Sequence, residues 1–591
     1  MKPTTERIVD GSSSDDSGLT SQSGGLPGGI YGPSPLREVQ VLRPLSSDGQ
    51  EAAPDQSNNQ REEVRGQQND PNKPVAWKDL PCKDQLVVIT LARLSEPLVQ
   101  TSLQAYLFYQ LKWFDNSLPD STISSQAGAL HACFMGAQFL TAMLWGRIGD
   151  SRRFGRKSVL LIGLLGTSLS SLGFGFSTTF WQALFFRTLG GATNGNIGVM
   201  RTMISEIIRE KKFQARAFIL LPMTFNIGII VGPILGGLLS DPAGSYPDLF
   251  GDVAFFKSFP YATPNIVSAL FLLSAAAAVW LFLEETHDAL RDGPPDFGRR
   301  IGQKLSSILR GRRSGYSTVP TSDVDPDLDE ASGVATTPVK QGKRYTQTLP
   351  FKRIFTRNVS ITLFAYFLMT AHVGTFNSLW FVFLSTPTWD PATSEHPVRH
   401  LPFRFTGGLG LQPQSVGFAM AILGVVGITM QLLIYPALSA RLGTLRSWKY
   451  FLPCFPLVYF LVPYLSVVPS TTEPPAPKTG PAVWAALVAV LAIHVLGRTF
   501  ALPSATILIN NCTPHPSVLG TIHGLGQSVS SGARTVGPII GGVVYGLGLN
   551  AGVVGLMWWI LSGLAVCGFV ASQFVKEGDG HEIWLEGDED F

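Results

Sequence analysis

Long apolar runs separated by short polar links occupy most of the chain. A hydrocarbon core about 30 Å thick requires about 20 mostly apolar residues for each helix that crosses it. The runs of this kind span residues 85–110, 123–145, 158–177, 180–205, 215–239, 262–283, 358–385, 414–437, 449–468, 481–506, 518–546 and 551–574. The pattern predicts an all-α membrane protein whose twelve transmembrane helices form two halves of six helices each.

Polar stretches divide the chain further. The first residues are rich in Ser, Gly, Pro, Gln and Asp and contain no apolar run, which predicts a disordered tail without a cleavable signal peptide. We therefore expect an N-terminal tail (1–82), a first half (83–283), a central loop (284–357), a second half (358–575) and a C-terminal tail (576–591).

The central loop contains a basic amphipathic pattern over residues 299–313. Its apolar residues fall at helical spacing on one face, namely Ile301, Leu305, Ile308 and Leu309. A basic amphipathic helix of this kind is expected to lie on the anionic lipids of the inner leaflet. The alternative for this stretch is a disordered linker.

Basic residues gather in alternate links between the runs. The links after the second, fourth and eighth runs and the central loop are rich in Lys and Arg, whereas the links on the other side are poor in both. Because Lys and Arg are retained on the cytosolic side of a membrane, both chain ends are predicted to be cytosolic.

A short internal repeat supports two related halves. The sequence G-P-I-L-G-G begins at Gly232 in the fifth run, and G-P-I-I-G-G begins at Gly537 in the eleventh, which is the fifth run of the second half. Two repeated six-helix halves predict a transporter with a site near the middle of the membrane, between the halves.

Composition excludes several other classes of protein. The chain is 45% hydrophobic and 15% charged with a formal net charge of +3, and its basic residues do not form a nucleic-acid-binding surface. Its five cysteines lack the spacing of a metal site or disulfide framework. Phosphate-loop, serine-hydrolase and zinc-protease motifs are absent from the sequence. We expect no enzyme activity, no cofactor and no metal site.

The link after the second run reads W-G-R-I-G-D-S-R-R-F-G-R-K from Trp145 to Lys157. It resembles the G-x-L-x-D-R-x-G-R-K motif of the major facilitator superfamily, although four residues rather than two separate its acid from the following glycine. The resemblance implies a cytosolic latch between the halves, formed by Gly146, Asp150, Gly155, Arg156 and Lys157. The alternative is an ordinary basic cytosolic loop.

Two further motifs resemble those of the same superfamily. In the fourth run, Arg187, Gly191 and Gly195 match R-x-x-x-G-x-x-x-G, which implies that the arginine takes part in proton coupling. The alternative for Arg187 is an arginine that reaches the lipid headgroups. The fifth run matches the antiporter motif G-x-x-x-G-P-x-x-G-G through Gly228, Gly232, Pro233, Gly236 and Gly237. These small residues and the proline allow close packing and bending.

Longer segments resemble the zinc-induced-facilitator-like subgroup of plants and fungi. They include R-L-S-E-P at 93–97, G-N-I-G-V-M-R-T-M at 195–203 and P-Y-A-T-P-N at 260–265. Fungal members are mostly drug or metabolite exporters, and plant members are linked to zinc chelator, proton and potassium transport. The resemblance implies a drug:proton antiporter.

Ionisable residues inside the runs are the candidates for coupling, because charges are costly in a membrane unless they serve a function. Arg93 and Glu96 share one helix face, so Glu96 is either a proton carrier or half of a fixed ion pair. His372 lies near the middle of the seventh run and can titrate near neutral pH. Further candidates for a central cavity are Asn194, Asn226, His494, Arg498, Gln527 and Arg534.

Together these features predict a monomeric transporter that exports a small organic compound in exchange for protons by alternating access. The plasma membrane and the vacuolar membrane are both compatible with the sequence. The alternatives are a metal-chelate or ion transporter, and a membrane sensor that has a transporter fold but moves no solute.

Overall fold

The computed structural model describes residues 80–309, 345–411, 424–586 and 588, apart from 292, 393 and 395–397. The predicted N-terminal tail therefore lies outside the described residues, except for residues 80–82. Within the described ranges the fold is helical, and the one β-type contact is an isolated bridge between His400 and Arg404.

The first half is built from eight main helices that cover its six predicted spans. They are α2 (Lys83–Phe114), α3 (Asp120–Gly149), α4 (Gly155–Gly175), α5 (Phe180–Thr193), α6 (Asn196–Ile207), α7 (Lys211–Phe218), α8 (Leu220–Leu239) and α12 (Ala262–Phe282). The link before α12 holds three short helices, α9 (Pro242–Ser245), α10 (Pro247–Phe250) and α11 (Ala254–Ser258).

The second half begins after the short 3-10 helix η2 (Phe351–Ile354). Its helices are α14 (Arg357–Ser385), α16 (Tyr435–Leu442), α17 (Thr444–Phe451), α18 (Cys454–Leu461), η3 (Val462–Ser466), α19 (Pro481–Asn511), η4 (Pro516–Val518), α20 (Leu519–Asn550) and α21 (Leu556–Gln573). Another helical segment, Gly424–Leu433, precedes α16.

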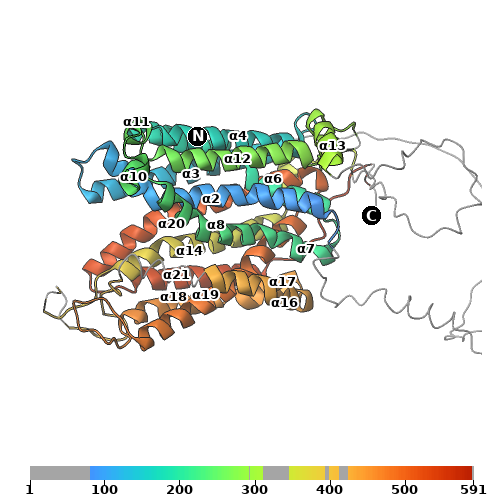
Figure 1. Ribbon diagram of the computed structural model, residues 1–591. Coiled ribbons are helices and arrows are strands. Elements are labelled where there is room, and N and C mark those ends of the chain that lie inside the picture. The colour runs from blue at the N-terminus through green and yellow to red at the C-terminus, as the bar shows by residue number, and fades with distance from the viewer. Residues whose placement is uncertain are drawn as a thin grey trace, which may run out of the picture. The chain divides into compact units, whose positions relative to one another are not determined.

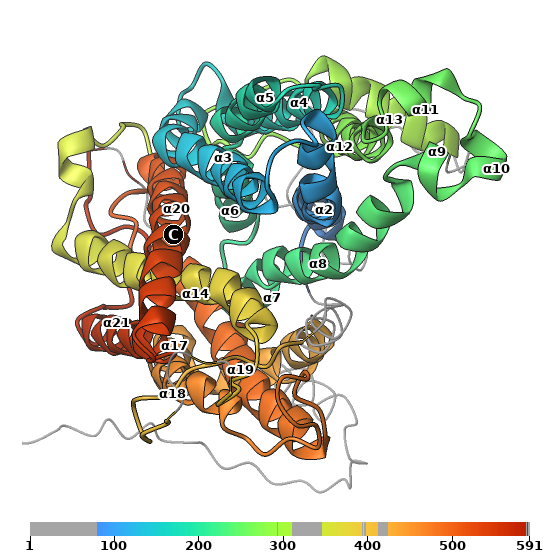
Figure 2. The same cartoon turned by 90° about the vertical axis from the view of Figure 1, so that its left-hand side faces the viewer.

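The two halves form separate groups of roughly parallel helices. Figure 1 shows the first half, coloured blue to green, above the second half, coloured yellow to red, and Figure 2 shows the same two groups viewed along the helices, from the left-hand end of Figure 1. We call one end of the bundle the basic end, because Arg147, Arg152 and Arg156 lie in or beside the α3–α4 link there. In Figure 1 the two groups lie closest at this end, on the right, and diverge toward the other.

Eight described helices are long and apolar enough to cross a membrane, and the bent pair Gly424–Leu433 and Tyr435–Leu442 provides a ninth candidate. The three remaining predicted spans are helical in the structure but are not among these long apolar helices, each for a local reason. The fourth span is broken between α5 and α6, and the ninth is divided into α17, α18 and η3. The eleventh, α20, is continuous but carries many polar residues, among them His523, Gln527 and Arg534.

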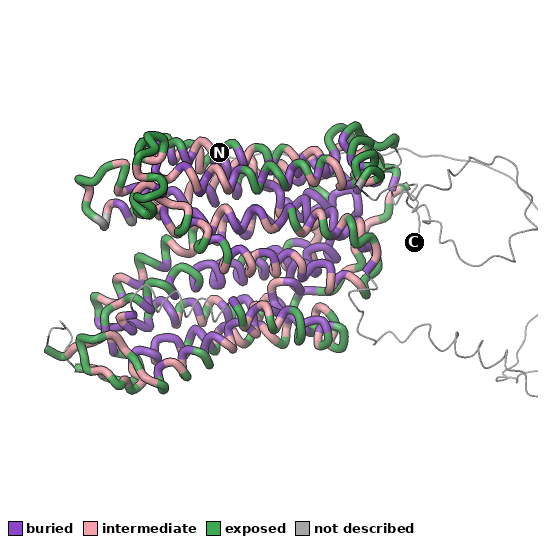
Figure 3. The backbone as a smooth tube through the Cα atoms, viewed as in Figure 1, coloured by how far each residue is buried: buried purple, intermediate pink, exposed green. Residues whose placement is uncertain are grey.

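Each half has its own apolar core. Figure 3 shows buried positions along the inner sides of the helices and exposed positions on the outside. Large apolar side chains are exposed on these outer faces, including Leu140, Leu169, Trp181 and Phe185. An outer surface of this kind is stable in contact with lipid chains rather than water.

The glycine repeat packs in the same way in both halves. A side chain at Gly232 of α8 would overlap Thr101 of α2, and one at Gly537 of α20 would overlap Thr375 of α14. The last glycine of each repeat, Gly237 or Gly542, faces open space. The fifth helix of each half therefore packs closely on the first helix of the same half through equivalent glycines.

Helix α13 (Phe297–Leu309) begins two residues before the predicted amphipathic segment 299–313 and overlaps it as far as Leu309, after which the segment lies outside the described ranges. It packs against the end of α12, where Gly298 approaches Trp280 and the Arg299 guanidinium donates to the carbonyl of Phe282 at 2.8 Å. Its apolar side chains Phe297, Ile301, Leu305 and Ile308 are exposed.

Candidate transport site and contacts between the halves

Asp150, the C-cap residue of α3, binds the first turn of α20 in the opposite half. Its Oδ1 atom accepts from the backbone N–H of Gly520 at 2.9 Å. Its Oδ2 atom accepts from the backbone N–H of Thr521 at 2.6 Å and from the Thr521 hydroxyl. A carboxylate at a helix N-terminus satisfies N–H groups that have no partner in the helix and interacts favourably with the helix dipole.

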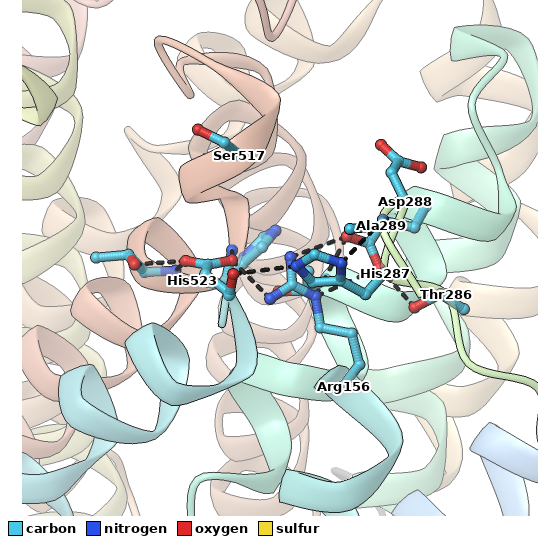
Figure 4. Close-up of polar contacts among 12 residues, drawn as sticks. Arg156, Thr286, His287, Asp288, Ala289, Ser517 and His523 are labelled. Carbon is cyan, nitrogen blue, oxygen red and sulfur yellow. Dashed lines mark hydrogen bonds and ion pairs between the residues drawn. The ribbon is translucent and has the colours of Figure 1, made fainter. Parts of the chain in front are cut away.

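Arg156 connects this carboxylate to a second one. Its Nη1 atom lies 2.6 Å from Asp150 Oδ1, and its Nη2 atom lies 3.0 Å from Glu206 Oε1. Only 1% of the arginine side chain is exposed, so the two carboxylates compensate its buried charge. Glu206 also accepts from the Thr286 hydroxyl at 2.5 Å. Figure 4 shows Arg156 beside Thr286 and His287, which belong to the segment after α12.

The residues after α12 bind the beginning of α4. Both oxygens of Glu285 accept backbone N–H groups, one from Arg156 and one from Lys157, at 3.0 Å each. His287 Nε2 lies 3.0 Å from the Asp150 carbonyl oxygen. Gly155 has a φ of +71°, and a side chain there would overlap Glu285. Glycine is required by both its conformation and the space available.

Sequence reasoning missed Glu285 and His287 in this cluster. The available signal was the acidic sequence E-E-T-H-D at 284–288, which directly follows an apolar run and therefore had to lie near the basic links.

Two groups near the cluster, both outside the membrane spans, have shifted pKa values. Partial burial raises the pKa of Asp296, but hydrogen bonds from Lys157 and the Arg299 backbone outweigh burial and bring the pKa below its ordinary value. The Lys157 Nζ atom lies 2.6 Å from this carboxylate. Burial raises the pKa of Tyr345, with Arg156 opposing it, so the phenol remains protonated near neutral pH.

Close backbone packing accompanies these polar contacts. A side chain at Gly146 of α3 would overlap the backbone oxygen of Gly520 and would come within 3.0 Å of Gly524. One turn earlier in α3, the Met143 backbone N–H donates to Ser528 Oγ at 3.1 Å. Helices α3 and α20 therefore run against each other from the basic end toward the middle of the bundle.

A second polar group lies deeper in the first half. Arg93 donates to Glu96 at 2.8 Å, and both side chains are almost fully buried. The side-chain amide of Asn194 also donates to this carboxylate. The three residues come from α2 and from the break between α5 and α6.

The polar group continues across the boundary between the halves. The Gln138 amide of α3 donates to the Asn194 carbonyl at 3.1 Å. The Gln138 side-chain oxygen accepts from Gln527 at 3.2 Å and from the Ser531 hydroxyl at 2.6 Å, both in α20. A buried hydrogen-bonded chain thus connects Glu96 with the second half.

The break in the fourth span explains how this chain forms. Asn194 and Gly195 stand between α5 and α6, so nearby carbonyl groups lose their helical partners. The Trp145 indole donates to the Ala192 carbonyl at 2.7 Å, and the Gln138 side-chain amide donates to the Asn194 carbonyl. Two side chains of α3 thereby replace hydrogen bonds that a continuous helix would have made.

Arg187 points into the first half. Its guanidinium lies 4.4 Å from the centre of the Phe134 ring, a cation–π distance. It lines a small cavity together with Glu96, Phe134 and Asn265. The side chain is therefore directed toward the interior and not toward the headgroups.

A second cavity lies between the halves on the side of α8 and α19. Asn226 of the first half and Arg498 of the second both line it, together with Phe225 and Gln431. The Asn226 amide donates to Gln431 Oε1 at 3.0 Å across the boundary. Two of the predicted cavity residues thus line one cavity.

The histidine candidates lie elsewhere, in an aromatic cluster of the second half. His372 Nδ1 lies 2.9 Å from the Tyr459 hydroxyl. His494 stacks on Phe376 with ring centres 3.8 Å apart. Neither histidine has a hydrogen bond to the Glu96 chain among the described residues. The remaining candidate, Arg534, donates to the Ser530 carbonyl at 3.4 Å.

The chain matches the Major Facilitator Superfamily family model over residues 90–538. It belongs to this superfamily and is a multi-pass membrane transporter, not an enzyme. The family and the all-helical membrane fold predicted from sequence are therefore confirmed.

Specific relatives support the same assignment. The chain is 34% identical over 534 residues to the Major facilitator superfamily multidrug transporter mfsB of Aspergillus fumigatus, with 85% of each chain covered. It is 24% identical over 461 residues to the Protein ZINC INDUCED FACILITATOR 1 of Arabidopsis thaliana, with 78% of this chain and 84% of the relative covered. It also matches the crystal structure of the human organic anion transporter MFSD10 (TETRAN) with a TM-score of 0.55 at 18% identity, covering 83% of this chain and 99% of that chain. This last similarity concerns the fold alone.

Proposed function

We propose that this transporter exports a small organic compound from the cytosol in exchange for protons, as a monomer working by alternating access. The similarity to a multidrug transporter supports the substrate class. The single observation that supports coupling is the position of Glu96, which lines a cavity while its carboxylate accepts from Arg93 and Asn194.

Glu96 would couple proton movement to export of the organic compound, because its protonation changes the hydrogen bonds that it can make. A protonated carboxyl group no longer forms an ion pair with Arg93, and one of its oxygens becomes a donor. Through Asn194 and Gln138, this change would reach Gln527 and Ser531 of the other half. Arg187, in the same cavity, would adjust the proton affinity, whereas the isolated position of His372 favours a packing role.

Substitution of Glu96 by Gln tests this proposal in proteoliposomes, with a panel of fluorescent amphipathic organic compounds as probes. We expect the wild type to move at least one probe when a pH gradient is imposed. The E96Q variant should lose this pH-driven transport yet retain exchange of labelled for unlabelled probe, which moves no net proton. Glu210→Gln provides a control, because Glu210 is exposed and pairs only with Lys212 among the described residues.

Loss of exchange together with pH-driven transport in E96Q would contradict a coupling role and favour a fixed ion pair. Wild-type protein that binds probes but moves none would instead favour the membrane sensor. Movement of metal chelates in place of organic probes would favour the metal-chelate transporter.

We further propose that Gly146, Asp150, Gly155, Arg156 and Lys157 form a latch that holds the basic end closed, and that the glycines and Pro233 of α8 provide close packing and flexibility. The support is that Asp150 and Arg156 connect α3, α4 and the first turn of α20. Opening of the basic end would have to break these contacts, so the latch would favour access from the opposite end.

The basic end is proposed to face the cytosol. Its exposed Cys82 and a cysteine introduced at the exposed Ser117, at the opposite end, test this orientation. In sealed vesicles with the cytosolic side inward, an impermeant maleimide should label Ser117→Cys at once and Cys82 only after permeabilisation. The reverse order would refute the orientation. An exporter of this orientation suits the plasma membrane or the vacuolar membrane, and microscopy of a fluorescent fusion distinguishes them.

We also propose that α13 binds anionic lipids of the inner leaflet. Its exposed apolar residues would enter the bilayer surface, while the exposed Arg300 and Lys304 would contact lipid headgroups. Phosphatidylserine should therefore raise the thermal stability of the wild type more than that of R300Q/K304Q. Arg404→Gln, at the opposite end, is the control, and equal stabilisation of all three proteins would contradict the proposal.

A further inference from the structure

The residues after α21 lie against the loop between α19 and α20 at the basic end. The Gly580 backbone N–H donates to the Asn511 carbonyl at 2.9 Å, and the Ile583 N–H donates to the Pro514 carbonyl at 2.8 Å. The side chain of Thr346, near the end of the central loop, donates to the Glu586 carbonyl at 3.0 Å. The C-terminal segment is thus attached to the loop that leads into α20.

Three potential metal ligands meet at this attachment. His515 of the α19–α20 loop places its Nε2 atom 3.0 Å from Asp588 Oδ2, and His581 places its Nε2 atom 3.1 Å from the same oxygen. One ligand atom from each residue lies within 4.8 Å of the other two. The His515 and Asp588 side chains are fully buried, and that of His581 is 16% exposed.

The carboxylate of Asp588 is only partly satisfied. Its Oδ2 atom also accepts the Leu585 backbone N–H at 2.7 Å. Its Oδ1 atom is buried and has no hydrogen-bond partner among the described residues. A buried carboxylate oxygen without a donor is costly, so this position is suited to a cation or another missing partner.

From this geometry we propose that His515, His581 and Asp588 bind a divalent transition metal ion such as Zn²⁺. Ligands at about 2.0–2.1 Å in a tetrahedron are separated by about 3.3 Å. The two measured nitrogen–oxygen separations, 3.0 and 3.1 Å, are close to that value. The ion would take the place of the proton on each Nε2 atom, that proton would move to Nδ1 of the same ring, and water would complete the site. On His515 the newly protonated Nδ1 would donate to the Ser517 hydroxyl and give up the Ser517 backbone N–H, which it accepts at 3.2 Å without metal.

The surroundings of the cluster support rigid ligands. His515 Nδ1 accepts the Ser517 backbone N–H at 3.2 Å and lies 2.7 Å from the Ser517 hydroxyl, so the orientation of the ring is fixed. The His581 ring stacks on Trp584 with ring centres 3.9 Å apart. Two imidazole ligands favour zinc and related transition metals over calcium or magnesium, and a carboxylate oxygen is also found among zinc ligands.

A metal here would act on the helix that binds Asp150. His515 stands five positions before Gly520, whose backbone N–H donates to that carboxylate. A bound ion would hold the C-terminal segment on the α19–α20 loop and thereby fix the first turn of α20. The proposed metal site is thus a regulatory site, separate from the site for the transported compound. The proposal does not depend on the proposed export function.

Cobalt is a suitable probe, because Co²⁺ bound to such ligands absorbs visible light. The experiment uses purified full-length chain without a polyhistidine tag, treated with a chelator and then titrated with Co²⁺. We expect one saturable site per chain with a tetrahedral-type spectrum, which Zn²⁺ removes. His581→Asn and Asp588→Asn should each weaken binding by at least about tenfold. His400→Asn, at the opposite end, is the matched control and should bind like the wild type.

Hydrogen exchange provides a readout that does not depend on the spectrum. In the wild type, Zn²⁺ should slow exchange of the Gly580 and Ile583 amides, and a chelator should reverse this. With or without metal, the variants should show the exchange rates of the chelator-treated wild type. Such rates would also establish that the C-terminal segment still folds in the variants. Absence of saturable Co²⁺ binding, or binding unchanged in both variants, would overturn the proposal and leave a histidine–aspartate hydrogen-bond cluster.

Discussion

The Asp150 carboxylate accepts the backbone N–H of Gly520 at 2.9 Å, although 370 positions separate the two residues. The contact joins the C-cap of a helix in the first half to the first turn of a helix in the second half. Its strength depends on the negative charge, because Asp150 meets both a helix N-terminus and the guanidinium of Arg156.

Replacement of Asp150 by Asn should therefore open the basic end. The amide retains an acceptor but loses the charge, and hydrogen bonds to charged groups are worth about 1.5–3 kcal/mol. The closed population should fall about tenfold or more relative to the open one. Spin labels at the exposed positions Lys212 and Arg446 would report a longer distance between the halves. Asp115→Asn, at the opposite end, should leave the distance unchanged.

Gly146→Ala should disturb the same contact by steric overlap rather than by a change of charge. The added methyl group would overlap the backbone of Gly520, and overpacking of this kind costs about 1–3 kcal/mol. Thermal unfolding in detergent should show a lower midpoint than the wild type. Gly136→Ala is the matched control in the same helix, because open space surrounds it and alanine favours a helix. Equal midpoints for the two variants would contradict close packing at Gly146.

The glycine repeats provide a test of the equivalence of the halves. Gly232→Ala and Gly537→Ala should both lower the thermal midpoint, since each methyl group would overlap a threonine of the first helix in its half. Gly237→Ala and Gly542→Ala should be neutral or stabilising, because nothing lies near either position. A pattern found in one half but not in the other would reject the equivalence.

Arg156→Lys should be destabilising although the charge is retained. Lysine presents one ammonium group and cannot bind Asp150 and Glu206 with the forked geometry of arginine. One buried carboxylate would lose its partner, at a cost of about 3 kcal/mol. The measurement is the thermal midpoint together with the yield of folded protein. Arg153→Lys, at an exposed position of the same link, should behave like the wild type.

Much of the fold could be predicted from sequence because membrane helices are constrained by length and polarity. The motifs around Asp150 and Gly232 could also be found, since each depends on a short run of small or charged residues. The bent and broken spans could not be placed in this way. Their breaks depend on whether a neighbouring side chain, such as Trp145 or Gln138, replaces a lost helical hydrogen bond.

The contacts between distant segments were harder to predict. Glu285 and Arg156 are 129 positions apart, and Gln138 and Ser531 are 393 positions apart. No local spacing connects such residues. The same holds for His515 and Asp588, which are separated by a complete helical hairpin and meet only in the folded chain.

The break at Asn194 and Gly195 has a consequence for how the halves move. Helix α5 packs on α3 and α4 of its own half, whereas α6 packs also on α20 of the other half. With no helical hydrogen bonds to bend at the break, α6 can follow α20 while α5 stays with its neighbours. We expect the two helices of the fourth span to move separately when the halves move, since α6 is the one that packs on α20.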